Sequence, residues 1–294
     1  MNKIEKTGSD RVFDTVNLVL CSILFVLVAY PLIYVVSASF SDPFAVLQGQ
    51  MKLIPVGFTL NSYAKILEHQ DILIGYKNSI ILVVLGTGIN FILTFFGAYT
   101  LSKKDLYGRT VITMFFAFTM FFNGGMIPRY LVVKGCGLLD TVWSMIIPGA
   151  ISMYNLVVMR TFFQNSIPDS LIEAAEIDGA SNWQIMFRVV LPLSKSIIAV
   201  ICLFYGVAHW NQYFQALLYL STREKFPLQI FLREILLLSQ VQDLVDTQGF
   251  TEQVMQGEGI KYSLIIVASV PVLMVYPFIQ KHFVKGVMLG AIKG

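Results

Sequence analysis

Charged side chains are scarce in this chain of 294 residues. Asp, Glu, Lys and Arg make up 13% of it, hydrophobic residues make up 56%, and the mean hydropathy is +0.69. A soluble domain carries about 25% charged residues, so this chain has too little polar surface to cover a globule in water. The composition therefore excludes an ordinary soluble domain and predicts a protein embedded in a lipid bilayer.

Several kinds of site are also missing from the sequence. The three cysteines form no Cys-x-x-Cys pair and the three histidines lie far apart, so we predict no metal site. The net charge is +3 without any long run of like charges, which argues against nucleic acid as a partner. The chain lacks a Gly-x-x-x-x-Gly-Lys-Ser/Thr loop for nucleotide phosphates, and it shows no catalytic triad or carboxylate pair. We therefore expect no bound cofactor and no enzymatic activity.

Six apolar stretches are long enough to cross a bilayer, which takes about 20 helical residues. They are 16–38, 79–101, 110–127, 142–162, 196–220 and 262–279. The first is longer than the apolar core of a signal peptide, about 7–15 residues, so we interpret it as a retained helix. The third is the weakest, because Asn123-Gly124-Gly125 and Pro128 interrupt its end. The pattern predicts an all-α polytopic membrane protein with six transmembrane helices in a single domain, 1–294.

The distribution of Lys and Arg predicts the orientation of these spans. Six spans place both termini on one side, and that side carries twelve of the 21 Lys and Arg residues. Its connections are also the shorter ones, so its basic residues are denser, as is typical of cytoplasmic segments. We therefore place both termini in the cytoplasm. The long connection 163–195 then lies inside the cell, and the connections 39–78 and 221–261 lie outside.

The inner connection contains signals for two short helices. Ser166 is a predicted N-cap, and the segment 169–178 is rich in residues that favour a helix. Gly179 ends this helix, because glycine tolerates the left-handed backbone of a helix terminus. Ser181 and Gln184 form a predicted capping box that opens a second helix. Such a helical pair on the cytoplasmic face suits docking into a groove of a partner protein.

The spacing within this loop resembles a known signature. Glu173-Ala174-Ala175 is followed by Gly179 and, after nine more residues, by Val189-Val190-Leu191-Pro192. This pattern is similar to the EAA signature in permease subunits of bacterial ATP-binding-cassette importers, although Ile is usual where this chain has Val189. A chance amphipathic loop in some other membrane protein is the alternative.

The resemblance implies an all-α, type I importer permease fold in which residues 166–192 form coupling helices on an ATPase subunit. Glu173, Ala174, Ala175 and Gly179 would form the core of that docking contact. The implied partners are a second permease, related rather than identical, two ATPase subunits that bind ATP and Mg, and an extracytoplasmic solute-binding protein. The implied location is the bacterial cytoplasmic membrane.

Further runs resemble the carbohydrate-uptake branch of that family. They are Phe-Phe-Asn-Gly-Gly-Met-Ile-Pro at 121–128, Gly-Leu-Leu-Asp-Thr at 137–141, Arg-Thr-Phe-Phe at 160–163, Trp-Asn at 210–211 and Ala-Leu-Leu-Tyr-Leu at 216–220. Within the branch, the resemblance is greatest to permeases for complex oligosaccharides such as fragments of pectin, xylan or alginate. The same machine with another cargo, an ion-coupled secondary transporter, and a membrane enzyme or sensor are the alternatives. The EAA-like loop and the near absence of charge within the spans disfavour the last two.

A few polar and aromatic residues inside the spans are candidates for sugar contact, because sugars bind to planar polar groups and stack on aromatic rings. The candidates are His209, Trp210, Asn211, Gln212 and Tyr213 in the fifth span, Asn90 in the second, and Tyr154 and Asn155 in the fourth. Hydrogen bonding between helices is the other explanation for such residues in a membrane. The sequence alone leaves both interpretations open.

Overall fold

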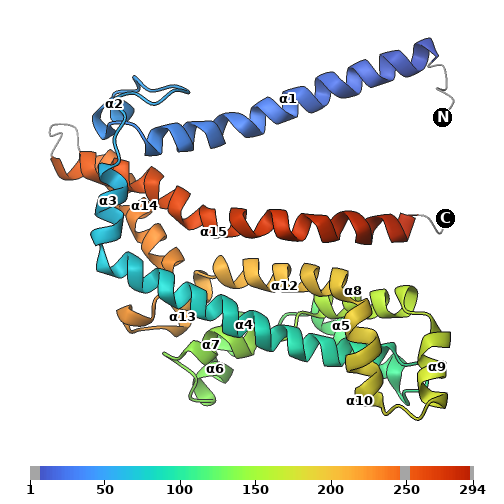
Figure 1. Ribbon diagram of the computed structural model, residues 1–294. Helices are drawn as coiled ribbons and strands as arrows, with labels where there is room; N and C mark the ends of the chain where they lie inside the picture. The colour runs from blue at the N-terminus through green and yellow to red at the C-terminus, as the bar shows by residue number, and fades with distance from the viewer. Residues whose placement is uncertain (1–6, 246–251, 292–294) are drawn as a thin grey trace. The chain divides into compact units, whose positions relative to one another are not determined.

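The computed structural model describes residues 7–245 and 252–291, so three of the basic residues counted above, Lys3, Lys6 and Lys293, lie outside the described part. The described residues form helices and connections and contain no strand (Figure 1). The elements are α1 Gly8–Ser39, α2 Pro43–Leu47, α3 Asn61–Glu68, α4 Gln70–Ser102, α5 Arg109–Phe121, α6 Met126–Gly135, α7 Val142–Ile146, η1 Ile147–Gly149, α8 Met153–Ser166, α9 Asp169–Ile177, α10 Asn182–Ile185, η2 Met186–Val190, α11 Leu191–Leu193, α12 Lys195–Trp210, α13 Phe214–Tyr219, η3 Arg223–Lys225, α14 Leu228–Val245 and α15 Glu252–Ala291.

Three of these helices, α1, α4 and the Gly259–Phe278 part of α15, are long and apolar enough to cross a membrane. Three bent pairs supply up to three more spans: α5 with α6 at 115°, α7 and η1 with α8 at 53°, and the helix Asn182–Leu193 with α12 at 83°. The predicted all-α polytopic fold is confirmed, and the six predicted spans are reached when each bent pair is counted as one span. The break predicted in the third span is confirmed as well, because α5 ends at Phe121 and Gly125 adopts a φ of 91°.

Two further predicted spans are not single helices. The fourth, 142–162, is broken between η1 and α8, with a bend of 53°. The fifth stretch, 196–220, is not one helix, because α12 ends at Trp210 and the separate helix α13 follows. Both the backbone N–H and the side-chain Nδ2 of Asn211 donate to the carbonyl of Val207, each at 3.1 Å. Asparagine competes with the helix for backbone partners in this way. The apolar composition of 214–220 gives no sign of this break in the sequence.

The chain divides into two compact units. The first contains the residues up to His69 together with Leu232–Ser269. Its contacts join the end of α1 to α15: Ser263 Oγ donates to the carbonyl of Ser39 at 3.1 Å, and the rings of Tyr34 and Tyr262 meet edge to face. The rest of α1 is exposed along its apolar length within this chain.

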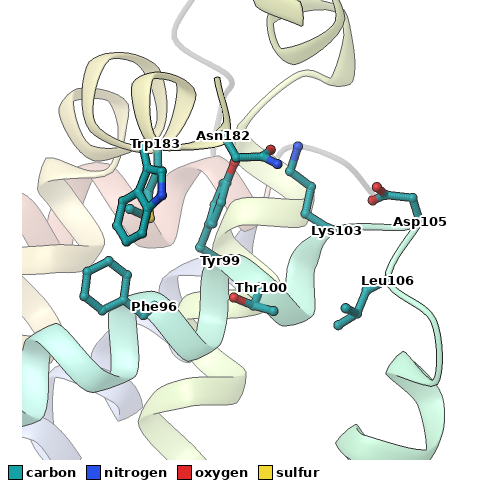
Figure 2. Close-up of a pocket in the computed structure, with 9 residues that line it drawn as sticks. Phe96, Tyr99, Thr100, Lys103, Asp105, Leu106, Asn182 and Trp183 are labelled. Carbon is teal, nitrogen blue, oxygen red and sulfur yellow. The ribbon is translucent and has the colours of Figure 1, made fainter. Parts of the chain in front are cut away.

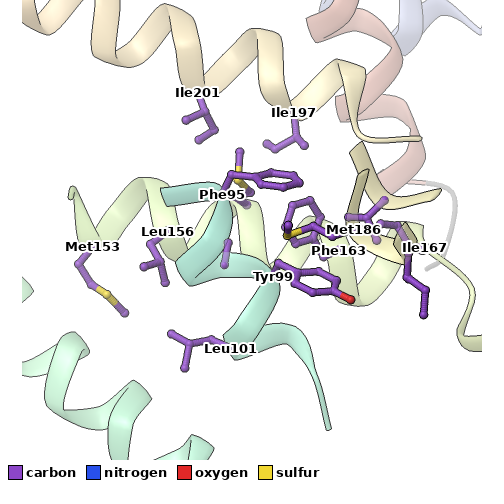
Figure 3. Close-up of a cluster of buried hydrophobic side chains, with 14 of the residues drawn as sticks. Phe95, Tyr99, Leu101, Met153, Leu156, Phe163, Ile167, Met186, Ile197 and Ile201 are labelled. Carbon is purple, nitrogen blue, oxygen red and sulfur yellow. The ribbon is translucent and has the colours of Figure 1, made fainter. Parts of the chain in front are cut away.

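The second unit, Gln70–Phe231 with Val270–Gly294, holds the main core. Helix α4 lies beside α8 and α12 (Figure 1). Its cluster of buried side chains includes Phe95 from α4, Phe163 from α8 and Ile201 from α12 (Figure 3). Ile167 and Met186, from the predicted inner loop, belong to the same cluster. Lipid tails are as apolar as these side chains, so helices in a bilayer are held by close packing and by polar bonds between them.

Candidate functional site

The first helix of the predicted docking loop is α9. Its N-cap is Pro168, so the prediction that Ser166 caps it is wrong; Ser166 is the last residue of α8, which runs further than the apolar pattern indicates. At its other end, Gly179 has a φ of 79° and donates to the carbonyl of Glu176 at 3.0 Å, while Ala180 donates to that of Ala175 at 2.9 Å. These two bonds define a Schellman ending. The predicted glycine turn is confirmed.

The second helix opens with the predicted capping box. Ser181 N donates to Gln184 Oε1 at 2.8 Å, and Gln184 N donates to Ser181 Oγ at 3.4 Å. A π-helical turn, η2, then leads to Leu191 and Pro192. Proline lacks an N–H and needs room at the carbonyl four residues earlier, and the wider π turn gives that room. The last residues of the signature, Leu191 and Pro192, therefore lie at the kink that precedes α12.

Part of this loop is free to meet a partner. Glu173, Ala174 and Gly179 are exposed, whereas Ala175 packs against the core. The most exposed large apolar side chains of the loop are Ile177 at 86% and Trp183 at 63%. Because they lie on a loop outside the predicted spans, these side chains are available for contact with a partner protein. Neither residue was predicted from the sequence, and the signal that could have found them is a large apolar residue beside each helix cap.

Trp183 lies at one edge of a hollow between α10 and the end of α4 (Figure 2). The hollow has a volume of about 310 Å³, and Phe96, Tyr99 and Lys103 line its α4 side. The Trp183 ring stacks on Phe187 with centroids 6.0 Å apart, and it meets Phe96 edge to face at 5.8 Å. These ring contacts fix the indole on the surface of the unit.

A second, larger cavity of about 870 Å³ lies among α4, α7, α8 and α12. The predicted candidates Asn90, Tyr154, Asn155, His209, Asn211 and Gln212 all line it, together with Met145, Gly149, Ser152, Leu203, Phe204, Tyr205, Val207, Ala208 and Gln215. Among these described lining residues there is no Lys, Arg, Asp or Glu. The cavity therefore offers neutral hydrogen-bonding groups and aromatic rings.

A chain of hydrogen bonds crosses one wall of this cavity. The amide nitrogen of Gln212 donates to the carbonyl of Met145 at 3.1 Å, so its oxygen faces Nδ1 of His209, at 3.2 Å, as an acceptor. Nδ1 therefore carries the ring proton. Nε2 of the neutral ring then accepts from Nδ2 of Asn90, at 3.0 Å. The oxygen of Asn90 is buried and has no hydrogen-bond partner among the described residues.

A second set of polar contacts lies one turn of α12 away. The hydroxyls of Thr94 and Tyr205 lie 2.6 Å apart, and the backbone N–H of Ser152 donates to the Tyr205 hydroxyl at 2.9 Å. The Ser152 side chain in turn accepts from Asn155 N at the start of α8. These bonds join α4, α12 and α8 around the cavity. Tyr205 was not predicted from the sequence, although its spacing of four residues from His209 places both on one helix face.

Trp210 and Tyr213 do not line this cavity. Trp210 is buried, meets Tyr76 edge to face at 5.5 Å, and lines a separate apolar cavity of about 530 Å³. Tyr213 lies past the end of α12, against Phe214. The predicted cluster is therefore divided, because the helix ends within it and its residues face different directions.

On the other end of this unit, Asp140 holds two loops together. It has a φ of 55°, and its carboxylate accepts from the backbone N–H groups of Ser221 and Thr222 at 2.9 and 3.0 Å and from Lys225 Nζ at 2.7 Å. The bonds from Lys225 and Thr222 hold the pKa of Asp140 well below its usual range. A salt bridge of 2.8 Å between Arg223 and Asp71 ties the same loop to the start of α4.

Comparison with known proteins gives consistent matches. The model of the family described as binding-protein-dependent transport system inner membrane component matches residues 105–289. The chain is 40% identical to Protein LplC of Bacillus subtilis strain 168, over 100% of this chain and 99% of that protein. It is 42% identical to the polygalacturonan/rhamnogalacturonan transport system permease protein YtcP of the same organism, over 97% and 99%.

A solved structure is similar along nearly the whole chain. It is the crystal structure of a bacterial ABC transporter involved in the import of the acidic polysaccharide alginate, and the matching chain is 36% identical with a TM-score of 0.86. The match covers 96% of this chain and 100% of that chain. The fold described above is therefore that of an importer permease.

Proposed function

This chain belongs to the family of binding-protein-dependent transport system inner membrane components, and on that premise we propose that it forms half of the transmembrane pathway of an ATP-driven oligosaccharide importer. The resemblance to the EAA-containing permeases is confirmed by the family match. The observation that carries the proposal is that one unit holds both an exposed docking loop and a neutral polar cavity, and that α4 borders both.

The proposed division of labour assigns ATP hydrolysis to partner subunits. Two ATPase subunits bind ATP and Mg, a second, related permease completes the pathway, and an extracytoplasmic solute-binding protein delivers the cargo. The termini and the loop 166–192 lie in the cytoplasm, and the whole chain acts as one permease domain. The exposed residues Glu173, Ala174 and Gly179 form the centre of the ATPase contact, with Ala175 beneath them and Leu191 and Pro192 at the root.

The cavity supports a sugar as cargo. Its polar side chains are uncharged, and amides and hydroxyls exchange hydrogen bonds with sugar hydroxyls without leaving a buried charge. Tyr154 is more than half exposed on its wall, and its ring lies 6.3 Å from that of Phe204. These rings give a face for a pyranose to stack on. Breakdown fragments of polysaccharides such as pectin, xylan or alginate are the proposed cargo class, in line with the names of the relatives. The carboxylates of an acidic fragment find no cation in this lining, so the second permease or the solvent would have to supply one.

The proposal is tested with the purified permease pair, its ATPases and its binding protein in proteoliposomes. Oligosaccharides from pectin, xylan and alginate are offered in turn, with an amino acid mixture as the non-sugar arm. We expect ATP-dependent uptake and stimulated ATP hydrolysis with one oligosaccharide class, and no ATP hydrolysis by this chain alone. Uptake driven by an ion gradient without ATP, or stimulation by the amino acids only, would refute the oligosaccharide importer.

A further inference from the structure

The cytoplasmic end of α4 is bonded to the elements that lead into the docking loop. The last carbonyls of a helix lack partners within it. Here Arg160 Nε of α8 donates to the carbonyl of Leu101 at 2.9 Å, and Gln164 of α8 donates to that of Ser102 at 3.4 Å. Arg109 of α5 donates to the carbonyl of Lys103 at 3.4 Å. Cationic groups near the C-terminus of a helix also interact favourably with the negative pole of its dipole. Together these bonds hold the end of α4 against α8.

Lys103 extends this connection to α9. Its Nζ lies 3.2 Å from Glu176 Oε1, and it lies 5.6 Å from the centre of the Tyr99 ring. The side chain of Lys103 is only 20% exposed. Burial lowers its pKa, but the bond to Glu176 and the neighbouring Tyr99 outweigh burial, so the pKa of Lys103 is raised and the side chain stays charged. Figure 2 shows this lysine reaching from α4 towards α10.

A neighbouring ion pair gives a natural contrast. Lys104 lies 2.6 Å from Asp169, but the two side chains are 75% and 63% exposed. Exposed ion pairs contribute little, about 0–1 kcal/mol, because water screens them and their long side chains lose entropy. The half-shielded pair of Lys103 and Glu176 is therefore the stronger of these two ionic contacts between α9 and the end of α4.

Beneath this pair, the loop is packed into the core. Ile167, Met186 and Val190 are buried in the same cluster as Tyr99 of α4 and Phe163 of α8 (Figure 3). Helix α4 runs unbroken over 33 residues and contains no proline, the commonest cause of a kink. Asn90 lies 13 positions before Lys103, roughly 20 Å along the helix. A displacement at Lys103 is therefore carried along a continuous helix to the wall of the cavity.

We infer that Lys103 is a positioning residue that ties α9 to the end of α4, so that movement of the docking loop shifts α4 and the contact between Asn90 and His209. The inference rests on the proposed function, because it needs an ATPase that moves the loop. Without the pair, the ATPases still dock on the exposed face of α9 and hydrolyse ATP. The movement of α9 is then transmitted to α4 only through apolar side-chain packing, so less substrate crosses the membrane for each ATP hydrolysed.

The test measures substrate transported per ATP hydrolysed in the reconstituted complex. We expect Lys103→Glu and Glu176→Lys each to lower this ratio by roughly three- to tenfold, the range for losing one partly shielded charge pair. The double variant with the charges exchanged restores the ratio. Lys104→Glu, the matched control, leaves it close to wild type. Lys103→Met is a second, milder variant that avoids placing two acidic groups together, and we expect the same direction.

An unchanged ratio in Lys103→Glu and Lys103→Met, or a loss that the exchanged pair does not restore, would overturn the inference. That outcome leaves the proposed function standing, because the ATP-dependent uptake assay and the docking variant Gly179→Pro test it separately. Wild-type transport in Gly179→Pro would contradict the docking role of the loop, and with it the proposed function. A merely structural role for Lys103 would reduce transport and ATP hydrolysis together, and it would leave their ratio unchanged.

Discussion

Replacing Gly86 by alanine should dislodge His209 from the cavity wall. An ideal Cβ at Gly86 would lie 2.7 Å from Cδ2 and Cε1 of His209 and closer still to Nε2. Carbon atoms do not approach ring atoms this closely, so one group must move. The ring is not a free end, because Asn90 and Gln212 hold its two nitrogens and only 6% of His209 is exposed.

The size of the effect follows from lost hydrogen bonds and from steric overlap. A hydrogen bond between membrane helices contributes about 0.6 kcal/mol on average, so losing both bonds of the ring costs roughly 1 kcal/mol. Overpacking of a close-packed site costs about 1–3 kcal/mol. We therefore expect Gly86→Ala to destabilise the chain by roughly 2–4 kcal/mol, most of it from steric overlap. Oligosaccharide uptake should fall as well, since the displaced ring breaks the hydrogen bonds that hold Asn90 and Gln212 in place on the cavity wall.

The assay is a denaturant titration of the purified chain in mixed micelles, with uptake measured in parallel. Gly88→Ala is the matched control, because a Cβ at Gly88 meets nothing within 4 Å and alanine favours the helix. The double variant Gly86→Ala/His209→Ala should lose less stability than Gly86→Ala alone, since the small side chain makes room. Equal stability of the Gly86 and Gly88 variants, or an added loss in the double variant, would refute the steric argument.

Three further predictions concern other parts of the second unit. Asp140→Asn should weaken the hydrogen bond to the backbone amide of Thr222 and raise the hydrogen-exchange rate of that amide roughly tenfold. The pKa of Asp140 in the folded protein lies below the unfolded value of 3.8, so the protection of this amide in the wild type should be constant above about pH 5 and fall only in stronger acid. Loss of protection already near neutral pH would be inconsistent with this. Gly179→Pro should abolish transport while membrane insertion persists, as proline cannot adopt a φ of 79°; uptake assays and membrane fractionation check this, and wild-type uptake would contradict it. Gln212→Leu should weaken uptake by breaking the bonds to Met145 and His209, whereas an unchanged rate would remove that wall from the pathway.

The sequence predicted those features that depend on local chemistry. The glycine turn at 179 and the capping box at 181 follow from backbone conformation and hydrogen-bond donors within a few residues, and both are confirmed. Ser166 was assigned the wrong role because α8 continues to that residue; the packing of α8, not its local sequence, sets its length. The sequence did place the polar residues Asn211 and Gln212 directly after Trp210, but they were interpreted as candidates for sugar contact within a span, because the apolar run 216–220 follows them.

Which residues are buried, and which pair across helices, could not be predicted from the sequence. Nothing in the spacing shows that Lys103 pairs with Glu176 while Glu173 stays exposed, since both glutamates belong to one short helix. Likewise, the neutral ring of His209 follows only from the orientation that the Met145 carbonyl imposes on Gln212. These features depend on contacts between segments more than 60 positions apart, where periodicity carries no information.

Helix α4 is the element that these contacts share. Its N-terminal end is held by the salt bridge of Asp71 to Arg223, and Ser79 Oγ accepts from the backbone of Leu228 at 2.9 Å. Its middle carries Asn90, and Lys103 directly follows its C-terminal end. Bonds at the start, middle and end of one proline-free helix couple its two ends. If the docking loop moves the C-terminal end, as we propose, we expect the cavity wall and the loop at Arg223 to move with it, which is the geometry that an alternating pathway requires.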